Sequence, residues 1–164
     1  VLTEKFIEVL AKSAPLHDIG KVGIPDNVLL KPDKLTPEEW DMMKTHAAIG
    51  AAAIERAERD APRPVDFLSL AKEIAHWHHE KWDGSGYPDG LAGDAIPVSA
   101  RLMALADVFD ALISRRVYKP PMPYAQAREI IVEGRARHFD PDVVDAFLAE
   151  FETFCTIADR YREE

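Results

Sequence analysis

Apolar residues recur along the chain at the three- and four-residue spacing of helices that bury one face, and they rarely alternate with polar residues as strands do. Near the start, Phe6, Val9 and Leu10 follow this spacing, and a long apolar segment with the same spacing opens after Pro97. Stretches rich in glycine and proline separate the segments. The pattern predicts an all-α bundle with little or no sheet, with helices at 2–12, 16–19, 26–30, 37–44, 46–59, 65–81, 97–112, 124–137 and 140–161.

One helix start has a specific sequence signal. Thr36 is followed by Pro37 and, three residues after the threonine, by Glu39. Threonine is a good N-cap, proline suits the first helical position, and a glutamate at this spacing hydrogen-bonds back to the cap. We therefore expect a capped helix that begins here and runs to about Lys44.

Length and composition indicate one globular domain. The chain has 164 residues with 47% hydrophobic and 30% charged positions, so we treat 1–164 as a single domain. Its net charge of −9 argues against a generally basic surface for duplex nucleic acid, and no apolar run is long enough for a membrane span. The single cysteine, Cys155, excludes an internal disulfide and favours a reducing compartment, so we expect a cytoplasmic protein. Because the first residue is Val1 rather than methionine, we expect a fragment of a longer protein.

Histidine and aspartate gather near predicted helix ends and turns, as His17-Asp18, His46, His78-His79 and Asp107. Imidazole nitrogens and carboxylate oxygens are suitable ligands for first-row transition metals. A carboxylate has two oxygens and can bridge two metal ions, so this set suffices for a two-metal site with open coordination positions. Such a site activates a hydroxide and supports in-line displacement at phosphorus.

Each of these groups also has a simpler interpretation when it is taken alone. A His-Asp pair is most often a capped helix turn, and a single histidine such as His46 is most often a surface or capping residue. The joint pattern, with glycine-rich turns after two of the groups, is much less expected by accident. We therefore expect these side chains, far apart in the sequence, to meet around an open cleft.

The strings around these residues resemble the HD-GYP subgroup of the HD-domain phosphohydrolases. The matching strings are HDIGK at 17–21, a histidine at 46 with a glycine at 50, HHEKWDGSGYP at 78–88, ADVFDA at 106–111, RVYK at 116–119 and FDP at 139–141. They extend over most of the chain, and the string at 78–88 is long and specific.

The resemblance implies an all-helical HD domain with a GYP loop that hydrolyses cyclic di-GMP, a bacterial second messenger, to pGpG and/or GMP. It implies two divalent transition metal ions, iron or manganese first, with nickel, cobalt or zinc as alternatives. The roles that it carries over make Asp18 a bridge between two metals, completed on one side by His17 and Asp107 and on the other by His46, His78 and His79.

The resemblance also implies cationic groups for the phosphate. Lys21 would act beside the catalytic Asp18, and Arg116 and Lys119, three residues apart on one predicted helical face, would bind the phosphodiester. The simpler interpretation of these cations is an exposed, solvated basic face. Arg115 is adjacent and replaces Arg116 if the helix register differs.

Aromatic and histidine residues near these strings leave several interpretations open. We assign Tyr87 to substrate contact, whereas Trp82 is as well explained as a core anchor as by stacking on guanine. His76 is more often a buried or surface histidine than a partner of the metal ligands, and His138 has no role that the sequence indicates. Asp110 is better explained by capping, or by orienting a metal ligand, than by direct ligation.

The chain departs from the family at its start, where members commonly have a further metal-binding histidine. Glu4 and Glu8 are present, but no histidine precedes His17. A third metal is therefore expected only if the chain is a fragment and an upstream helix outside it carries that ligand. Besides cyclic di-GMP hydrolysis, this leaves open a weak or non-catalytic signalling module, and a hydrolase for another cyclic dinucleotide or nucleotide. The resemblance implies a receiver or sensory domain upstream, and the apolar first helix allows a homodimer.

Overall fold

The computed structural model describes residues 2–116 and 119–162, and these residues form helices joined by turns and loops. The elements are α1 (Glu4–Ser13), the 3₁₀ turns η1 (Ala14–Leu16) and η2 (Ile19–Gly23), α2 (Asp26–Leu29), α3 (Pro37–Lys44), α4 (His46–Asp60), α5 (Asp66–Trp77), the 3₁₀ turn η3 (Gly93–Ala95), α6 (Val98–Ile113), α7 (Tyr124–Glu133), α8 (Pro141–Ala149) and α9 (Phe151–Arg160). Within the described ranges there are isolated β-bridges but no strand. The predicted all-α fold is confirmed.

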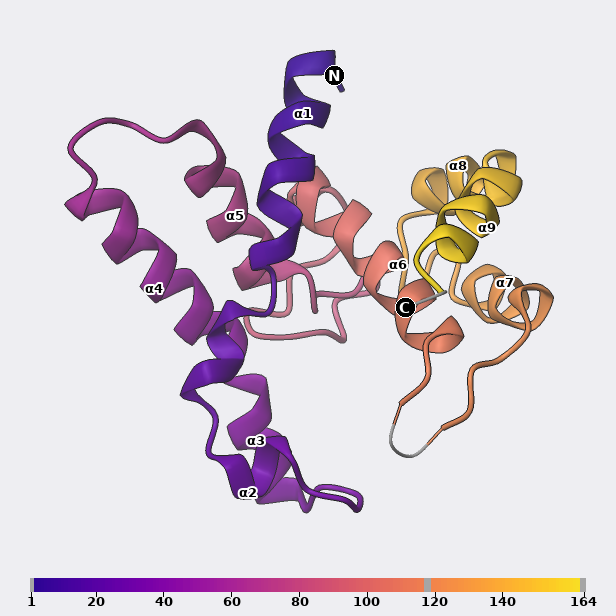
Figure 1. The fold of residues 1–164 in the computed structure, drawn as a ribbon, viewed down its shortest axis with the longest axis horizontal. Helices are drawn as coiled ribbons and strands as arrows, with labels where there is room; N and C mark the ends of the chain where they lie inside the picture. The colour runs from indigo at the N-terminus through magenta and orange to yellow at the C-terminus, as the bar shows by residue number, and fades with distance from the viewer. Residues whose placement is uncertain (1, 117–118, 163–164) are drawn as a thin grey trace.

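Helix α6 lies between two groups of helices (Figure 1). On one side α1, α4 and α5 pack together with η2, and on the other side α7, α8 and α9 form a second group. The short helices α2 and α3 extend from the lower end of α4. This arrangement places the ends of α4 and α5 and the turn between η1 and η2 in one region.

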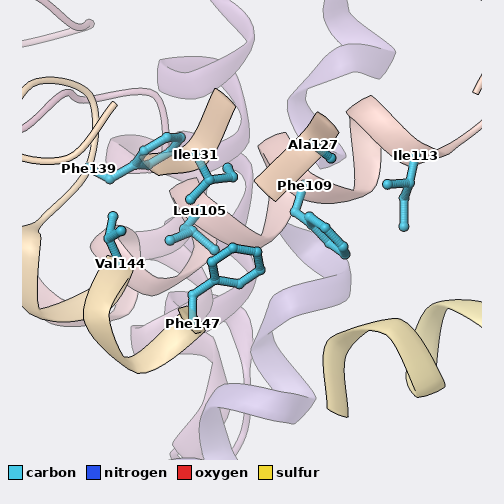
Figure 2. Packing of buried hydrophobic residues seen from close by; sticks show 8 residues of the cluster. All are labelled: Leu105, Phe109, Ile113, Ala127, Ile131, Phe139, Val144 and Phe147. Carbon is cyan, nitrogen blue, oxygen red and sulfur yellow. The ribbon is translucent and has the colours of Figure 1, made fainter. Parts of the chain in front are cut away.

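The main apolar core fills the space between α6 and the C-terminal helices (Figure 2). Phe109 from α6 lies 5.3 Å from the ring of Phe147 in α8, and Phe154 of α9 packs 5.0 Å from Phe147. A smaller cluster of Ile54, Ala71 and Ala75 joins α4 to α5. The small side chains of α4 and α5 allow these two helices to approach closely.

Helix α6 contacts both groups because the helical period places different residues on its two faces. Leu105 and Phe109, four residues apart, share one face and are buried in the C-terminal core. Asp107, two residues from each, projects about 200° around the helix by the 3.6-residue period, toward the other group. A single helix thus carries core residues on one side and a candidate metal ligand on the other.

Several predicted helix starts are confirmed. Thr36 forms the expected capping box, since its hydroxyl accepts from the Glu39 N–H at 3.2 Å while the Glu39 carboxylate accepts from the Thr36 N–H at 2.8 Å. Helix α4 begins at His46 as predicted, and α6 starts directly after Pro97.

None of the helices formed by the described residues has both the length and the apolar content that a bilayer span requires.

The predicted helix at 65–81 is wrong at its C-terminal end. Helix α5 stops at Trp77, and His78 is its C-cap. The chain turns there because the next residues serve tertiary contacts: the Glu80 N–H donates to the Trp77 carbonyl in a tight turn, and the Glu80 side chain is buried against the following loop. The short helix predicted at 16–19 is likewise replaced by two 3₁₀ turns that flank His17 and Asp18.

The C-terminal helices are also shorter than predicted. The helix expected over 124–137 ends at Glu133, where Gly134 forms the C-cap. The helix expected over 140–161 is two helices that break at Glu150, whose backbone leaves helical geometry at φ −106° and ψ 18°. This break turns α9 back, so that Phe154 packs against the same core as Phe147.

Candidate metal centre

The predicted ligands do meet in space. Their donor atoms form two overlapping groups, each with all atoms within 4.8 Å of one another: Asp18, His46, His78 and His79 in the first, and His17, His78 and Asp107 in the second. The side chains come from the turn between η1 and η2, the start of α4, the end of α5 and the middle of α6. The convergence expected from the sequence is therefore present, and His78 belongs to both groups.

Three of the histidines are held in one tautomer by the backbone. Nδ1 of His17 lies 2.8 Å from the Ala14 carbonyl, Nδ1 of His46 lies 2.7 Å from that of Met43, and Nδ1 of His78 lies 2.8 Å from that of Ile74. A carbonyl only accepts, so each Nδ1 carries the proton and donates it. In the neutral ring Nε2 then carries a lone pair, which is the arrangement that supports metal-ligating histidines.

In two of these histidines, Nε2 faces the carboxylate of Asp18. The Nε2 atoms of His46 and His78 lie 3.5 and 3.6 Å from Oδ1 of Asp18. Both Oδ1 of Asp18 and Nε2 of His78 are buried without a hydrogen-bond partner in the described structure. Buried acceptors that face one another are unfavourable unless a cation lies between them. The donor set therefore fits a divalent transition metal.

His79 completes the first group. Its Nε2 lies 3.1 Å from Nε2 of His46, and its ring stacks on Tyr87 with centroids 4.9 Å apart. Burial, together with the neighbouring His78, lowers the pKa of His79 to about 3. The imidazole is therefore neutral at physiological pH and keeps a lone pair for a metal.

The second group is more strongly charged. His17 Nε2 lies 3.3 Å from both Asp18 Oδ2 and Asp107 Oδ1. Burial acts to lower the pKa of His17, but hydrogen bonds to Asp107 and Asp18 outweigh it and raise the pKa to about 10. Burial opposes ionisation of Asp18 and Asp107, yet the His17 contacts hold the pKa of both carboxyls below its usual range.

Solvent reaches this side of the cluster. The side chains of His17, Asp18 and Asp107 are 20%, 29% and 26% exposed, whereas His46 and His78 are buried. The centre thus combines the buried imidazoles of His46 and His78 with a partly exposed edge formed by His17, Asp18 and Asp107.

A close backbone contact brings Asp18 to the start of α4. A Cβ on Gly20 would lie 1.8 Å from the His46 carbonyl oxygen and 2.5 Å from the Gly50 nitrogen, so only glycine fits. This contact lets η2 lie directly on α4 and places Asp18 beside His46. The glycines that follow the two histidine strings in the sequence are the signal for this approach.

Sequence reasoning missed Glu80. It is 2% exposed, and its carboxylate accepts the N–H groups of Asp89 at 2.6 Å, Gly90 at 3.1 Å and Leu91 at 3.0 Å. A buried carboxylate held by three backbone donors closes the loop after the two histidines. The sequence signal that could have indicated this role is its position directly after His78-His79 and before a glycine-rich loop.

The same loop covers His79. The Tyr87 N–H donates to the His79 carbonyl, and Gly86 lies so near the turn that a Cβ would approach the Lys81 nitrogen to 2.4 Å. Burial, with the charges of Asp18 and Asp107, raises the pKa of Tyr87, so its phenol stays protonated. Tyr87 therefore packs on a candidate metal ligand.

Of the predicted cations, Lys21 lies at the cluster and the other two are exposed outside a helix. Lys21 Nζ donates to Asp18 Oδ2 at 2.9 Å. The expectation that Arg116 and Lys119 share a helical face is wrong: α6 ends at Ile113, and the two residues pair through backbone hydrogen bonds in an isolated antiparallel bridge. Val117 and Tyr118 between them lie outside the described residues.

The remaining candidates have structural partners. Trp82 lies under the Arg101 guanidinium at 5.8 Å, and Arg101 pairs with the buried Asp140 at 2.7 Å, which supports its interpretation as a core anchor. His76 Nε2 pairs with Asp89 at 3.0 Å, and His138 stacks on Phe139 at 4.1 Å. Asp110 is exposed and accepts from the Ser114 hydroxyl at 3.3 Å.

A family model described as an HD domain matches residues 2–143 of the chain. This chain belongs to the HD domain family. The matched range includes every residue of the two donor groups and ends within α8. The resemblance found from the sequence motifs is thereby confirmed.

Curated relatives are similar to this chain over nearly its whole length. The chain is 61% identical over 163 residues to a cyclic di-GMP phosphodiesterase of Vibrio cholerae, covering 99% of this chain and 33% of the relative. It is 47% identical over 163 residues to a cyclic di-GMP phosphodiesterase of Thermotoga maritima, covering 99% and 42%. It is 45% identical over 156 residues to a 3′3′-cGAMP-specific phosphodiesterase of Vibrio cholerae, covering 95% and 29%. The chain thus spans 29% to 42% of the length of these relatives.

Proposed function

We propose that this HD domain hydrolyses the phosphodiester bonds of cyclic di-GMP to pGpG and/or GMP with two divalent transition metal ions, iron or manganese. The observation that supports this most directly is that Nε2 of His78 and Oδ1 of Asp18, which lie 3.6 Å apart, are both buried without a hydrogen-bond partner among the described residues. We propose Asp18 as the bridging ligand, with His46, His78 and His79 on one side and His17 and Asp107 on the other. Bound there, the metals would supply a hydroxide at neutral pH and neutralise charge on the phosphodiester.

The chain's own groups account for ligand orientation and substrate binding in this proposal. The backbone carbonyls of Ala14, Met43 and Ile74 fix the imidazoles with Nε2 toward the site. Lys21, 40% exposed beside Asp18, would donate to a non-bridging phosphate oxygen and stabilise charge that develops on it. Arg116 and Lys119 would bind the phosphodiester from the exposed bridge after α6.

The test is turnover by anaerobically purified protein loaded with Mn²⁺ or Fe²⁺. Cyclic di-GMP should be converted to a linear product, and an Asp18→Ala variant with the same fold should lose both metal and activity. Equal turnover by Asp18→Ala would refute the ligand assignment. Less than one bound metal per chain, with no turnover after reconstitution, would favour the non-catalytic module, which the assembled donor set does not support.

A second substrate has specific support. One relative, 45% identical, is a 3′3′-cGAMP-specific phosphodiesterase, and this cyclic dinucleotide offers the same phosphodiester to the metal centre. Rates on cyclic di-GMP and 3′3′-cGAMP, measured at equal concentration, would decide between them. We expect cyclic di-GMP to be preferred, and a reversed ratio would assign the domain to the other substrate.

We also propose that regulation comes from outside these residues. The relatives are more than twice as long as the chain, which agrees with an additional receiver or sensory domain in the full protein. Helix α1 leads through η1 to His17 and Asp18. Leu2, just before this helix, and Ile7 within it are about half exposed, and a second copy would pack on this apolar surface. Sedimentation of wild-type protein and an Ile7→Glu variant would test the homodimer, which the variant should dissociate.

A further inference from the structure

Trp40 is a large aromatic side chain that stays exposed beside the candidate metal centre. It lies on α3, and 46% of its surface is exposed, although tryptophan is usually well buried. Its ring centroid is 6.0 Å from that of Tyr87, which itself stacks on His79 at 4.9 Å. A single ring therefore separates the exposed indole from a candidate metal ligand.

The two rings form a corner rather than a stack. The planes of Trp40 and Tyr87 lie 87° apart, whereas Tyr87 and His79 are within 19° of parallel. Tyr87 thus covers the imidazole, and Trp40 forms a second wall beside it. A flat aromatic ligand fits such a corner because it can stack on one wall and present its edge to the other.

Local packing does not explain why Trp40 holds this position. Across the described residues, its indole N–H has no hydrogen-bond acceptor, in contrast to Trp77, whose Nε1 donates to Asp89 at 2.7 Å. Trp82 also has a partner, the Arg101 guanidinium. Trp40 instead keeps an exposed π-surface and a free donor, the two features with which proteins bind nucleobases.

We propose that Trp40 is the residue on which a purine base of the cyclic dinucleotide stacks while its phosphodiester meets the metal centre. This inference rests on the proposed function and assigns Trp40 as a positioning residue, because it contacts the base and not the reacting phosphate. Stacking on an indole is tolerant of base identity, since every base has a π-face. The same wall therefore serves guanine and adenine, and discrimination between cyclic di-GMP and 3′3′-cGAMP lies elsewhere in the site.

The kinetic test compares Trp40→Ala, Trp40→Phe and the matched control Met42→Ala, a 42%-exposed residue of the same helix. For Mn²⁺-loaded Trp40→Ala, KM for cyclic di-GMP should rise at least about fivefold with kcat within about threefold of wild type. Trp40→Phe should recover most of the affinity, and Met42→Ala should match wild type. Metal content should be equal in all four proteins.

A spectroscopic test separates this inference from the proposed function. A hydrolysis-resistant phosphorothioate analogue of cyclic di-GMP should quench the fluorescence of wild-type protein, and the quench should be absent in Trp40→Phe although the analogue still binds. Turnover by wild type with an unchanged KM in Trp40→Ala, or a quench that persists in Trp40→Phe, would overturn the role of Trp40 alone. Absence of turnover in wild type would overturn the proposed function. If, in addition, the analogue leaves the fluorescence of wild type unquenched, the role of Trp40 is overturned as well.

Discussion

The two sides of α6 bury opposite kinds of side chain. Toward the C-terminal helices, Phe109 and Phe147 pack ring against ring at 5.3 Å in an apolar core. Toward α4 and α5, Nε2 of His78 and Oδ1 of Asp18 are buried acceptors for which residues 2–116 and 119–162 supply no hydrogen-bond partner. The first arrangement stabilises the fold by removing apolar surface from water, whereas the second costs free energy unless a cation is bound. Stability and function are therefore separated in space, and substitutions on the two sides should have different consequences.

The largest effect on stability is expected for Phe147→Ala. Phe147 is 2% exposed and contacts Phe109, Phe151 and Phe154, so its truncation should lower the free energy of unfolding by about 3–5 kcal/mol. Urea denaturation measures this change, with the 40%-exposed Val132→Ala as a control expected within about 0.5 kcal/mol of wild type. Metal affinity of the folded variant should be unchanged, and a parallel loss would show that the two sides are not independent.

The next effect is on metal binding and comes from the opposite side of α6. His78→Asn keeps an N–H near the Nδ1 position for the Ile74 carbonyl but removes the buried Nε2 lone pair, so Mn²⁺ affinity should fall by more than about 100-fold. The free energy of unfolding in the presence of a chelator should change little, because the Nε2 lone pair does not stabilise the fold when no metal is bound. Calorimetric titration and chelated urea denaturation measure the two quantities, and a wild-type affinity would remove His78 from the site.

Glu80→Gln tests the connection between the loop and the centre. The amide keeps one acceptor oxygen but places an NH₂ against one of the three backbone donors of Asp89, Gly90 and Leu91. The free energy of unfolding should therefore fall by about 2 kcal/mol. Limited proteolysis should also show faster cleavage in the loop. Asp94→Asn, whose side chain is 93% exposed near the same loop, is the matched control and should behave as wild type. Equal protection of the loop in both variants would contradict the role of Glu80.

The smallest effect is a change in pH dependence. Burial, reinforced by Lys81, lowers the pKa of His138 to about 4, below the usual value of 6.5. Between these values the unfolded chain binds the proton more tightly, so His138 destabilises the fold as pH falls from about 6.5 toward 4. At pH 5 His138 should lower the free energy of unfolding by about 1 kcal/mol after allowance for solvent screening. Thermal unfolding at pH 7.5 and 5.0 should show a smaller acid loss for His138→Gln than for wild type, and identical losses would exclude this contribution.

Local patterns in the sequence were enough for the helical fold and the set of candidate ligands. The Thr36 capping box and the start of α6 after Pro97 depend on neighbouring residues, and such local preferences can be read directly. The His and Asp strings identified the donors by chemical type. The ends of α5, α7 and the helix predicted at 140–161 were missed, because burial of Glu80 and the return of Phe154 to the core depend on residues distant in sequence.

By itself, the sequence determined an all-α protein with a candidate set of imidazole and carboxylate ligands, since helix periodicity and ligand chemistry are properties of single residues and their spacing. Only the tertiary structure decided that His78 joins both donor groups and that Arg116 and Lys119 leave the helix. It also placed Trp40, from a helix that contains none of the strings of the HD-GYP resemblance, beside Tyr87. These outcomes depend on contacts between segments distant in sequence, such as the Gly20 contact that brings η2 onto α4. Spacing along the chain does not encode such contacts.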